Sequence, residues 1–168
     1  EAESPGWREM VGQYILYFFL SAALGWAAEV CFAAWKERRL VNRGFLNGPL
    51  CPVYGFGMAA MLLLLAPWQG NVLAVFAGGM AITTLIEWLA GWLLYKLFRA
   101  RWWDYSHLPF NIGGFVCLPF SLLWGAASVV MLLAVHPPIA RLAAAIPPGV
   151  LRAVDIVLLC LLAADAAG

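Results

Sequence analysis

The sequence predicts an all-α fold, a polytopic bundle of transmembrane helices with about five spans. Hydrophobic residues make up 64% of the 168 residues and charged residues 11%, whereas soluble domains carry about 25% charged residues. From Gly44 to Tyr95 the chain holds a single formal charge, Glu87. Long runs of Leu, Ala and Val exclude the alternating strands of a β-barrel. The chain therefore belongs in a lipid bilayer.

A transmembrane span needs about 20 predominantly apolar residues. On that basis we expect helices at residues 11–35, 48–66, 71–98, 113–135 and 149–166. Pro67 and Gly70 mark the connection between the second and third helices, and two Pro-Pro pairs lie between the fourth and fifth. Asp155 and Asp165 interrupt the fifth segment, so a truncated or surface-lying helix is the alternative there.

Basic residues predict the orientation, because cytoplasmic loops carry an excess of Lys and Arg. Residues 36–47 and 99–112 are the two expected cytoplasmic loops, with the N-terminus outside. The expected cytoplasmic side holds seven basic residues, namely Lys36, Arg38, Arg39, Arg43, Lys96, Arg99 and Arg101, against Arg8, Arg141 and Arg152 outside. Tryptophans typical of interfacial anchors stand at the predicted span ends, at positions 7, 35, 68, 102 and 103.

The chain reads as a single transmembrane domain, 1–168, with a parallel repeat of two helical hairpins. The hairpins are 11–66 and 71–135, and the helix 149–166 is additional. The first helix of each hairpin has a Trp close to a Glu. A Gly-x-x-Cys sequence follows in each, from Gly48 to Cys51 and from Gly114 to Cys117. The alternative is chance recurrence in a Trp-rich chain. If the repeat holds, Glu29 and Glu87 face each other across a pseudo-twofold axis.

Glu29 and Glu87 are the leading candidates for a substrate- or ion-binding site. A carboxylate within a span costs about 2.5–3.5 kcal/mol, and such residues usually mark a functional path. Two facing carboxylates would raise each other's pKa, as a proton-coupled or cation-selective site requires. The plain alternatives are a partly solvated Glu29 paired with a loop arginine and a Glu87 that only holds two helices together.

Two sequence segments on the expected cytoplasmic side contain the remaining candidate site residues. Residues 42–55 contain Arg43, a counter-ion for Glu29 or for a lipid headgroup, together with Asn47 and Tyr54. Residues 102–111 contain Asp104, Tyr105 and Asn111. The alternatives are that Arg43 is a positive-inside anchor and that the second string only locks a loop.

Several function classes have no support. The chain contains no phosphate-binding loop, no G-x-S-x-G elbow and no H-E-x-x-H motif. The four cysteines form no C-x-x-C pair, so we expect no metal and no cofactor. A net charge of +1 argues against a nucleic-acid partner.

The strings at residues 42–55 and 102–125, with Glu29 and Glu87, resemble a bacterial membrane family labelled putative ABC-transporter type IV, or CmpB-like permease. The resemblance covers about residues 11–130 and leaves out the fifth helix. It implies a small protein of the bacterial inner (plasma) membrane described as a transporter permease, with a separate ATPase subunit as a partner. The expected cytoplasmic loops, 36–47 and 99–112, are short for binding an ATPase.

Three functions follow from these observations. The first is a transport component, a homo-oligomer among membrane lipids with Glu29 and Glu87 lining a path. The second is a membrane enzyme that acts on a lipid or amphiphile at the cytoplasmic interface through Asp104, Tyr105, His107 and Arg43. The third is a non-catalytic assembly factor or sensor. Glu87 favours transport, because headgroup chemistry has no use for so deep a carboxylate, so the protein is more an ion- or solute-binding component than an enzyme.

Overall fold

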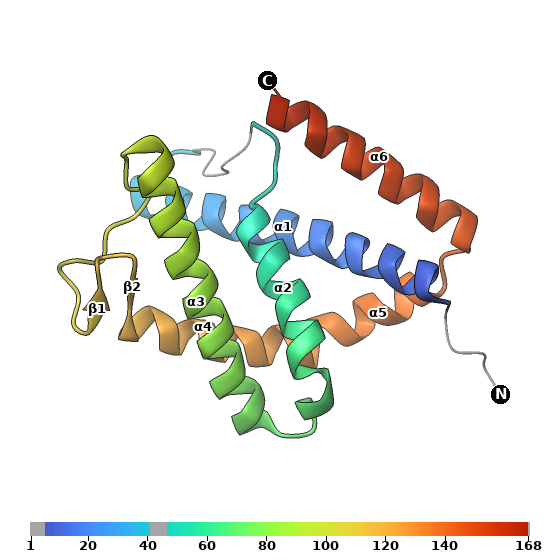
Figure 1. Ribbon diagram of the computed structural model, residues 1–168, viewed down its shortest axis with the longest axis horizontal. Helices are drawn as coiled ribbons and strands as arrows, with labels where there is room; N and C mark the ends of the chain where they lie inside the picture. The colour runs from blue at the N-terminus through green and yellow to red at the C-terminus, as the bar shows by residue number, and fades with distance from the viewer. Residues whose placement is uncertain (1–5, 41–46, 168) are drawn as a thin grey trace. The chain divides into compact units, whose positions relative to one another are not determined.

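The computed structural model describes residues 6–40 and 47–167, and these residues form the expected all-α fold (Figure 1). A π-helical turn and a short 3-10 turn interrupt the α-helices, and one small antiparallel hairpin joins two of them. The elements are α1 (Trp7–Glu37), α2 (Pro52–Leu65), η1 (Ala66–Trp68), α3 (Val72–Phe98), β1 (Asn111–Ile112), β2 (Val116–Cys117), α4 (Leu118–Val130), η2 (Met131–Val135), α5 (His136–Ala144) and α6 (Pro148–Ala167).

Within the described residues, three helices are long and apolar enough to cross a bilayer, by length and composition: Trp7–Glu37, Val72–Phe98 and Leu118–Ala144. The predicted second span is a shorter apolar helix, Pro52–Trp68. Large apolar side chains are exposed along these helices, among them Leu73 at 78% and Leu63 at 67%. Such surfaces suit contact with lipid tails, where apolar exposure carries no penalty.

The first, second and fourth helices have bounds that differ from the sequence-based expectation. The second helix begins at Pro52 rather than 48, because Pro49 and Pro52 lack N–H donors and Pro52 suits the first helical turn. The first helix is longer at both ends than 11–35. The fourth begins at Leu118 rather than 113, because the residues before it form the β1–β2 hairpin.

The fourth helix also continues past the Pro-Pro pair that was expected to end it. Residues Met131–Val135 form a π-helical turn, and the N–H of His136 bonds to the carbonyl of Met131. Pro137 and Pro138 follow directly, as α5 begins. A π turn inserts one extra residue and shifts the hydrogen-bond register. The prolines, which cannot donate, are thereby accommodated without a break.

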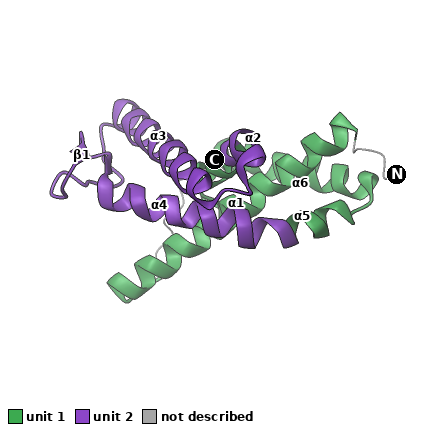
Figure 2. Cartoon of the chain, turned by 90° about the horizontal axis from the view of Figure 1, so that it is seen from below, with its two compact units in different colours: residues 1–59, 139–168 green, residues 60–138 purple. Residues whose placement is uncertain are grey.

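The chain divides into two compact units, which are described separately (Figure 2). Unit 1 comprises residues 1–59 and 139–168, and unit 2 comprises residues 60–138.

In unit 1, α6 lies beside α1 and runs in the same direction (Figure 1). Near the start of α1, a Cβ on Gly12 would come 3.2 Å from a methyl carbon of Leu151. At the far end of α6, the N–H of Gly48 donates to Asp165 at 2.9 Å. The fifth segment is therefore a full helix packed along α1.

In unit 2, α3 packs against α4 through small residues. Gly79 lies against Ser128, and a Cβ on Gly125 would come 2.9 Å from the ring of Phe76. The hydroxyl of Thr84 donates to that of Ser121 at 2.8 Å. Small residues let two helices approach closely where no hydrophobic effect drives them together. The small residues of α3 and α4 therefore permit their close packing.

Candidate functional site

In unit 1, Glu29 of α1 is paired with a tyrosine of α2. The Tyr54 hydroxyl donates to Glu29 Oε1 at 2.6 Å, and both residues are half-buried. Gly25 lies one turn before Glu29, and the Tyr54 ring packs directly against it. A Cβ at position 25 would overlap this ring. The N–H of Cys51 also donates to the carbonyl of Ala22 at 3.0 Å, which fixes the start of α2 on α1. The glycine thus creates the space in which the tyrosine reaches the carboxylate.

In unit 2, Glu87 of α3 is held by two aromatic donors. The Tyr105 hydroxyl donates to Oε1 and the Trp124 indole N–H to Oε2, each at 3.2 Å. Tyr105 comes from the loop after α3, and Trp124 comes from α4. The Tyr105 ring stacks on Phe120, with centroids 4.7 Å apart and planes at 15°. Glu87 therefore joins two helices and the loop between them.

The two units reach a similar arrangement from different chain positions. Tyr54 lies three residues after Cys51, and Phe120 lies three residues after Cys117. Phe120 has no hydroxyl, and the tyrosine stacked on it provides one for Glu87. Tyr54 and Tyr105 were both candidates from sequence, but their pairing with the glutamates was not predicted, and Trp124 was missed. The shared Cys-x-x-aromatic spacing was the sequence signal that could have aligned Tyr54 with Phe120.

Asp104 and Asn111 form hydrogen bonds within the loop that carries Tyr105. Asp104 accepts the N–H of Ser106 at 3.0 Å, and this hydrogen bond holds the pKa of Asp104 below its usual value. The Asn111 amide donates to the carbonyls of Ser106 and Leu108 at 3.2 and 2.9 Å. Its oxygen accepts the N–H of Gly114 at 3.2 Å. No hydrogen bond joins Asp104 to His107 among the described residues, so the geometry matches the loop-locking alternative.

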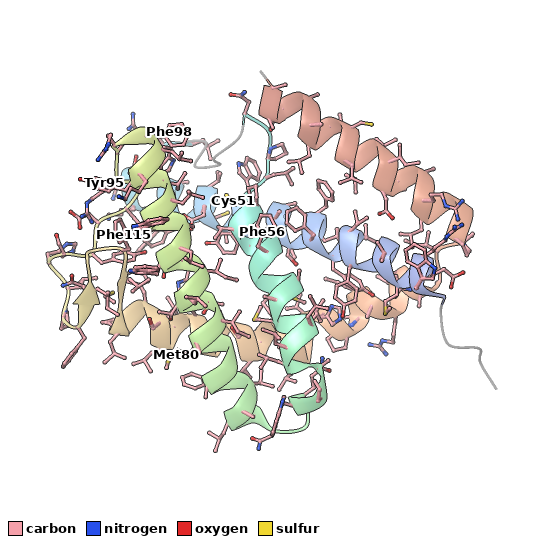
Figure 3. All side chains as sticks on the ribbon, in the orientation of Figure 1. Cys51, Phe56, Met80, Tyr95, Phe98 and Phe115 are labelled. Carbon is pink, nitrogen blue, oxygen red and sulfur yellow. The ribbon has the colours of Figure 1, made fainter. Side chains whose placement is uncertain are left out.

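The same loop is tied to the end of α3 by aromatic and cationic contacts. Arg101 donates to the carbonyl of Gly113 at 2.8 Å and lies over the rings of Tyr95 and Phe115, which Figure 3 labels. Trp103 donates its indole N–H to the carbonyl of Phe115 at 2.7 Å. Trp103 is thus a structural donor as well as a residue at a predicted span end.

The remaining candidates are dispersed. Arg43 lies outside the described residues, and Asn47 is exposed before α2. Cys51 and Cys117 are buried, and neither forms a disulfide among the described residues. Within the described ranges no group of three His, Cys, Asp or Glu side chains is placed to hold a metal ion.

The three long apolar helices are typical of a helical membrane protein. The chain belongs to the family described as "Putative ABC-transporter type IV", whose model matches residues 16–168. The match includes α6, so the expectation that the fifth helix lies outside the resemblance was wrong. No curated protein and no solved structure matches the chain.

Proposed function

We propose that this protein is a transport component of the bacterial inner membrane and that Glu29 and Glu87 bind protons or cations, one in each unit. The observation that carries the proposal is the repeated pairing of a glutamate within an apolar helix with a tyrosine hydroxyl. The family description supports a transporter-related role.

The hydrogen bonds to the two glutamates offset the cost of a carboxylate in an apolar helix. A charged carboxylate within a span costs about 2.5–3.5 kcal/mol. A hydrogen bond to a charged group returns about 1.5–3 kcal/mol. Because the two magnitudes are similar, the hydrogen bond offsets most of the cost of placing the carboxylate in the span. A tyrosine hydroxyl can donate to the carboxylate and can accept from the carboxylic acid, so the pair suits both states.

The hairpin repeat and the predicted orientation complete this proposal. Hairpins 11–66 and 71–135 would each contribute one glutamate–tyrosine pair, with Arg43 and Asn47 on the cytoplasmic side. A homo-oligomer would supply the additional spans that a permease needs, and a separate ATPase subunit would bind the loops at 36–47 and 99–112. The third function, an assembly factor or sensor, is favoured by one observation, the hydrogen-bonded loop that Asp104 and Asn111 close.

Flux through proteoliposomes tests the proposal. The purified chain is reconstituted with a trapped pH-sensitive dye, and proton movement is followed under an imposed sodium or potassium gradient. We expect Glu29→Gln and Glu87→Gln each to reduce the flux at least tenfold. Glu37→Gln, the same change near the end of α1, is the matched control and should leave it unchanged. Wild-type flux from both variants, or no flux above empty liposomes, would contradict a proton- or cation-binding role.

A further inference from the structure

Unit 1 contains a cavity that is separate from the glutamate–tyrosine pair. It has a volume of about 480 Å³ and lies between the first turns of α1 and those of α6. Its wall is mostly apolar, with Val11, Ile15 and Ile156 among its lining residues. This volume is within the usual range of about 300–1,000 Å³ for ligand pockets.

A buried carboxylate without a complete set of partners lines this cavity. Asp155 is 6% exposed, and among the described residues its Oδ1 has no hydrogen-bond partner. Gly12 faces it from α1, and a Cβ there would stand 2.9 Å from Oδ2. An unsatisfied buried carboxylate oxygen is costly and calls for an explanation. A donor that enters the cavity would satisfy it.

Two arginines line the same cavity one helical turn nearer the start of each helix. Arg152 precedes Asp155 by three residues, and Arg8 precedes Gly12 by four. Within the described residues no ion pair joins either arginine to Asp155. Guanidinium groups bind phosphate oxygens with matched geometry. Glu9 also lines the cavity beside Arg8, so two cationic groups and one carboxylate lie at one level, and Asp155 lies a turn further along.

We propose that this cavity binds a phosphoethanolamine group, with the ammonium at Asp155 and the phosphate at Arg8 and Arg152. A primary ammonium has three N–H donors and can supply the missing hydrogen bond to Asp155. A bare metal ion fits less well, because two arginines line the cavity and, among the described residues, no three His, Cys, Asp or Glu side chains are placed to hold a metal ion. The group is carried either by a free zwitterion or by the headgroup of phosphatidylethanolamine.

The test compares ligands that differ only in the amine. Thermal shift and titration of the full chain in detergent are run with O-phosphoethanolamine against phosphocholine. The same measurements use dioleoyl phosphatidylethanolamine against dioleoyl phosphatidylcholine in mixed micelles. The choline nitrogen carries three methyl groups and no N–H. We expect the wild type to prefer the ethanolamine member of at least one pair by about tenfold, the value of a charge-assisted hydrogen bond.

Asp155→Asn should abolish that preference, and Arg152→Gln should weaken both members of the pair. Asn keeps the shape of Asp and removes a buried charge, so the variant should fold. Glu37→Gln, outside the cavity, should bind like the wild type. A preference in the lipid pair alone identifies the headgroup as the source, and a preference in the soluble pair identifies a free zwitterion. Equal binding within both pairs, or a preference that survives Asp155→Asn, would overturn the proposal.

Discussion

Single residues decide how the two carboxylates are held in apolar surroundings. Glu29 has one tyrosine hydroxyl at 2.6 Å, and Glu87 has a tyrosine and a tryptophan, each at 3.2 Å. Phenol and indole donors add no formal charge, so these contacts stabilise a carboxylate without fixing it in an ion pair. The proposed binding of protons or cations would use these uncharged contacts.

Removal of the Tyr54 hydroxyl should destabilise the protein measurably. Tyr54→Phe keeps the ring against Gly25 but deletes the donor to Glu29, which we expect to cost about 1.5–3 kcal/mol of unfolding free energy. Equilibrium unfolding in detergent gives the value. Tyr14→Phe, on the same helix as Glu29, is the matched control, because no hydrogen bond of its hydroxyl is present among the described residues. Equal stability of the two variants would show that the Tyr54–Glu29 bond has no net value.

The hydrogen bond that lowers the pKa of Asp104 predicts an acid-sensitive loop. Because the folded pKa lies below the unfolded one, the contribution to stability is complete above the ordinary Asp pKa and is lost as the pH falls through the folded value. Hydrogen–deuterium exchange of residues 100–112 should therefore lose protection in the acid range, after correction for intrinsic rates. Asp104→Asn keeps an oxygen acceptor for Ser106 and should remove the pH dependence. The same acid profile in both proteins would assign the effect to another group.

At the scale of elements, close approach of helices determines which side chains meet. Tyr54 packs directly against α1 at Gly25, and Ser128 packs directly against α3 at Gly79. The apolar runs predicted the helices well, because a span of sufficient length follows from composition. The Pro-Pro pair did not predict the end of the fourth helix, since the π turn that accommodates it depends on local register. The glutamate–tyrosine pairs could not be predicted from the sequence either, because Tyr54 and Glu29 meet only through the packing of α2 on α1.

The role of Gly25 can be tested by adding one methyl group. Gly25→Ala places a Cβ where the Tyr54 ring lies, so the ring or the helix must shift, and we expect a loss of about 1–3 kcal/mol. Gly57→Ala, in α2, is the matched control, because nothing lies within 4 Å of the added Cβ. There the higher helix propensity of Ala should leave stability equal or slightly raised. If both variants unfold alike, the close α1–α2 contact is not what holds Tyr54 in place.

At the scale of the whole molecule, the direction of each helix decides which ends share a side of the membrane. The apolar helices and the family place the chain in a membrane, and the basic loops predict an N-terminus outside. α6 runs in the same direction as α1, so a spanning α6 would begin outside and end in the cytoplasm. Among the described helices, α6 is not one of the three that are long and apolar enough to cross a bilayer, so its topology is the one to test.

Cysteine accessibility tests this topology directly. In a variant with its native cysteines replaced, single cysteines are placed at Gln69, His107, Gly149 and Ala167, and intact spheroplasts are treated with an impermeant thiol reagent. We expect labelling at positions 69 and 149, and labelling of 107 and 167 only after the membrane is opened. Labelling of 149 and 167 from the same side would show that α6 lies on the surface. Labelling of 107 in place of 69 would reverse the orientation, and with it the cytoplasmic assignment of the loop that presents Tyr105 to Glu87.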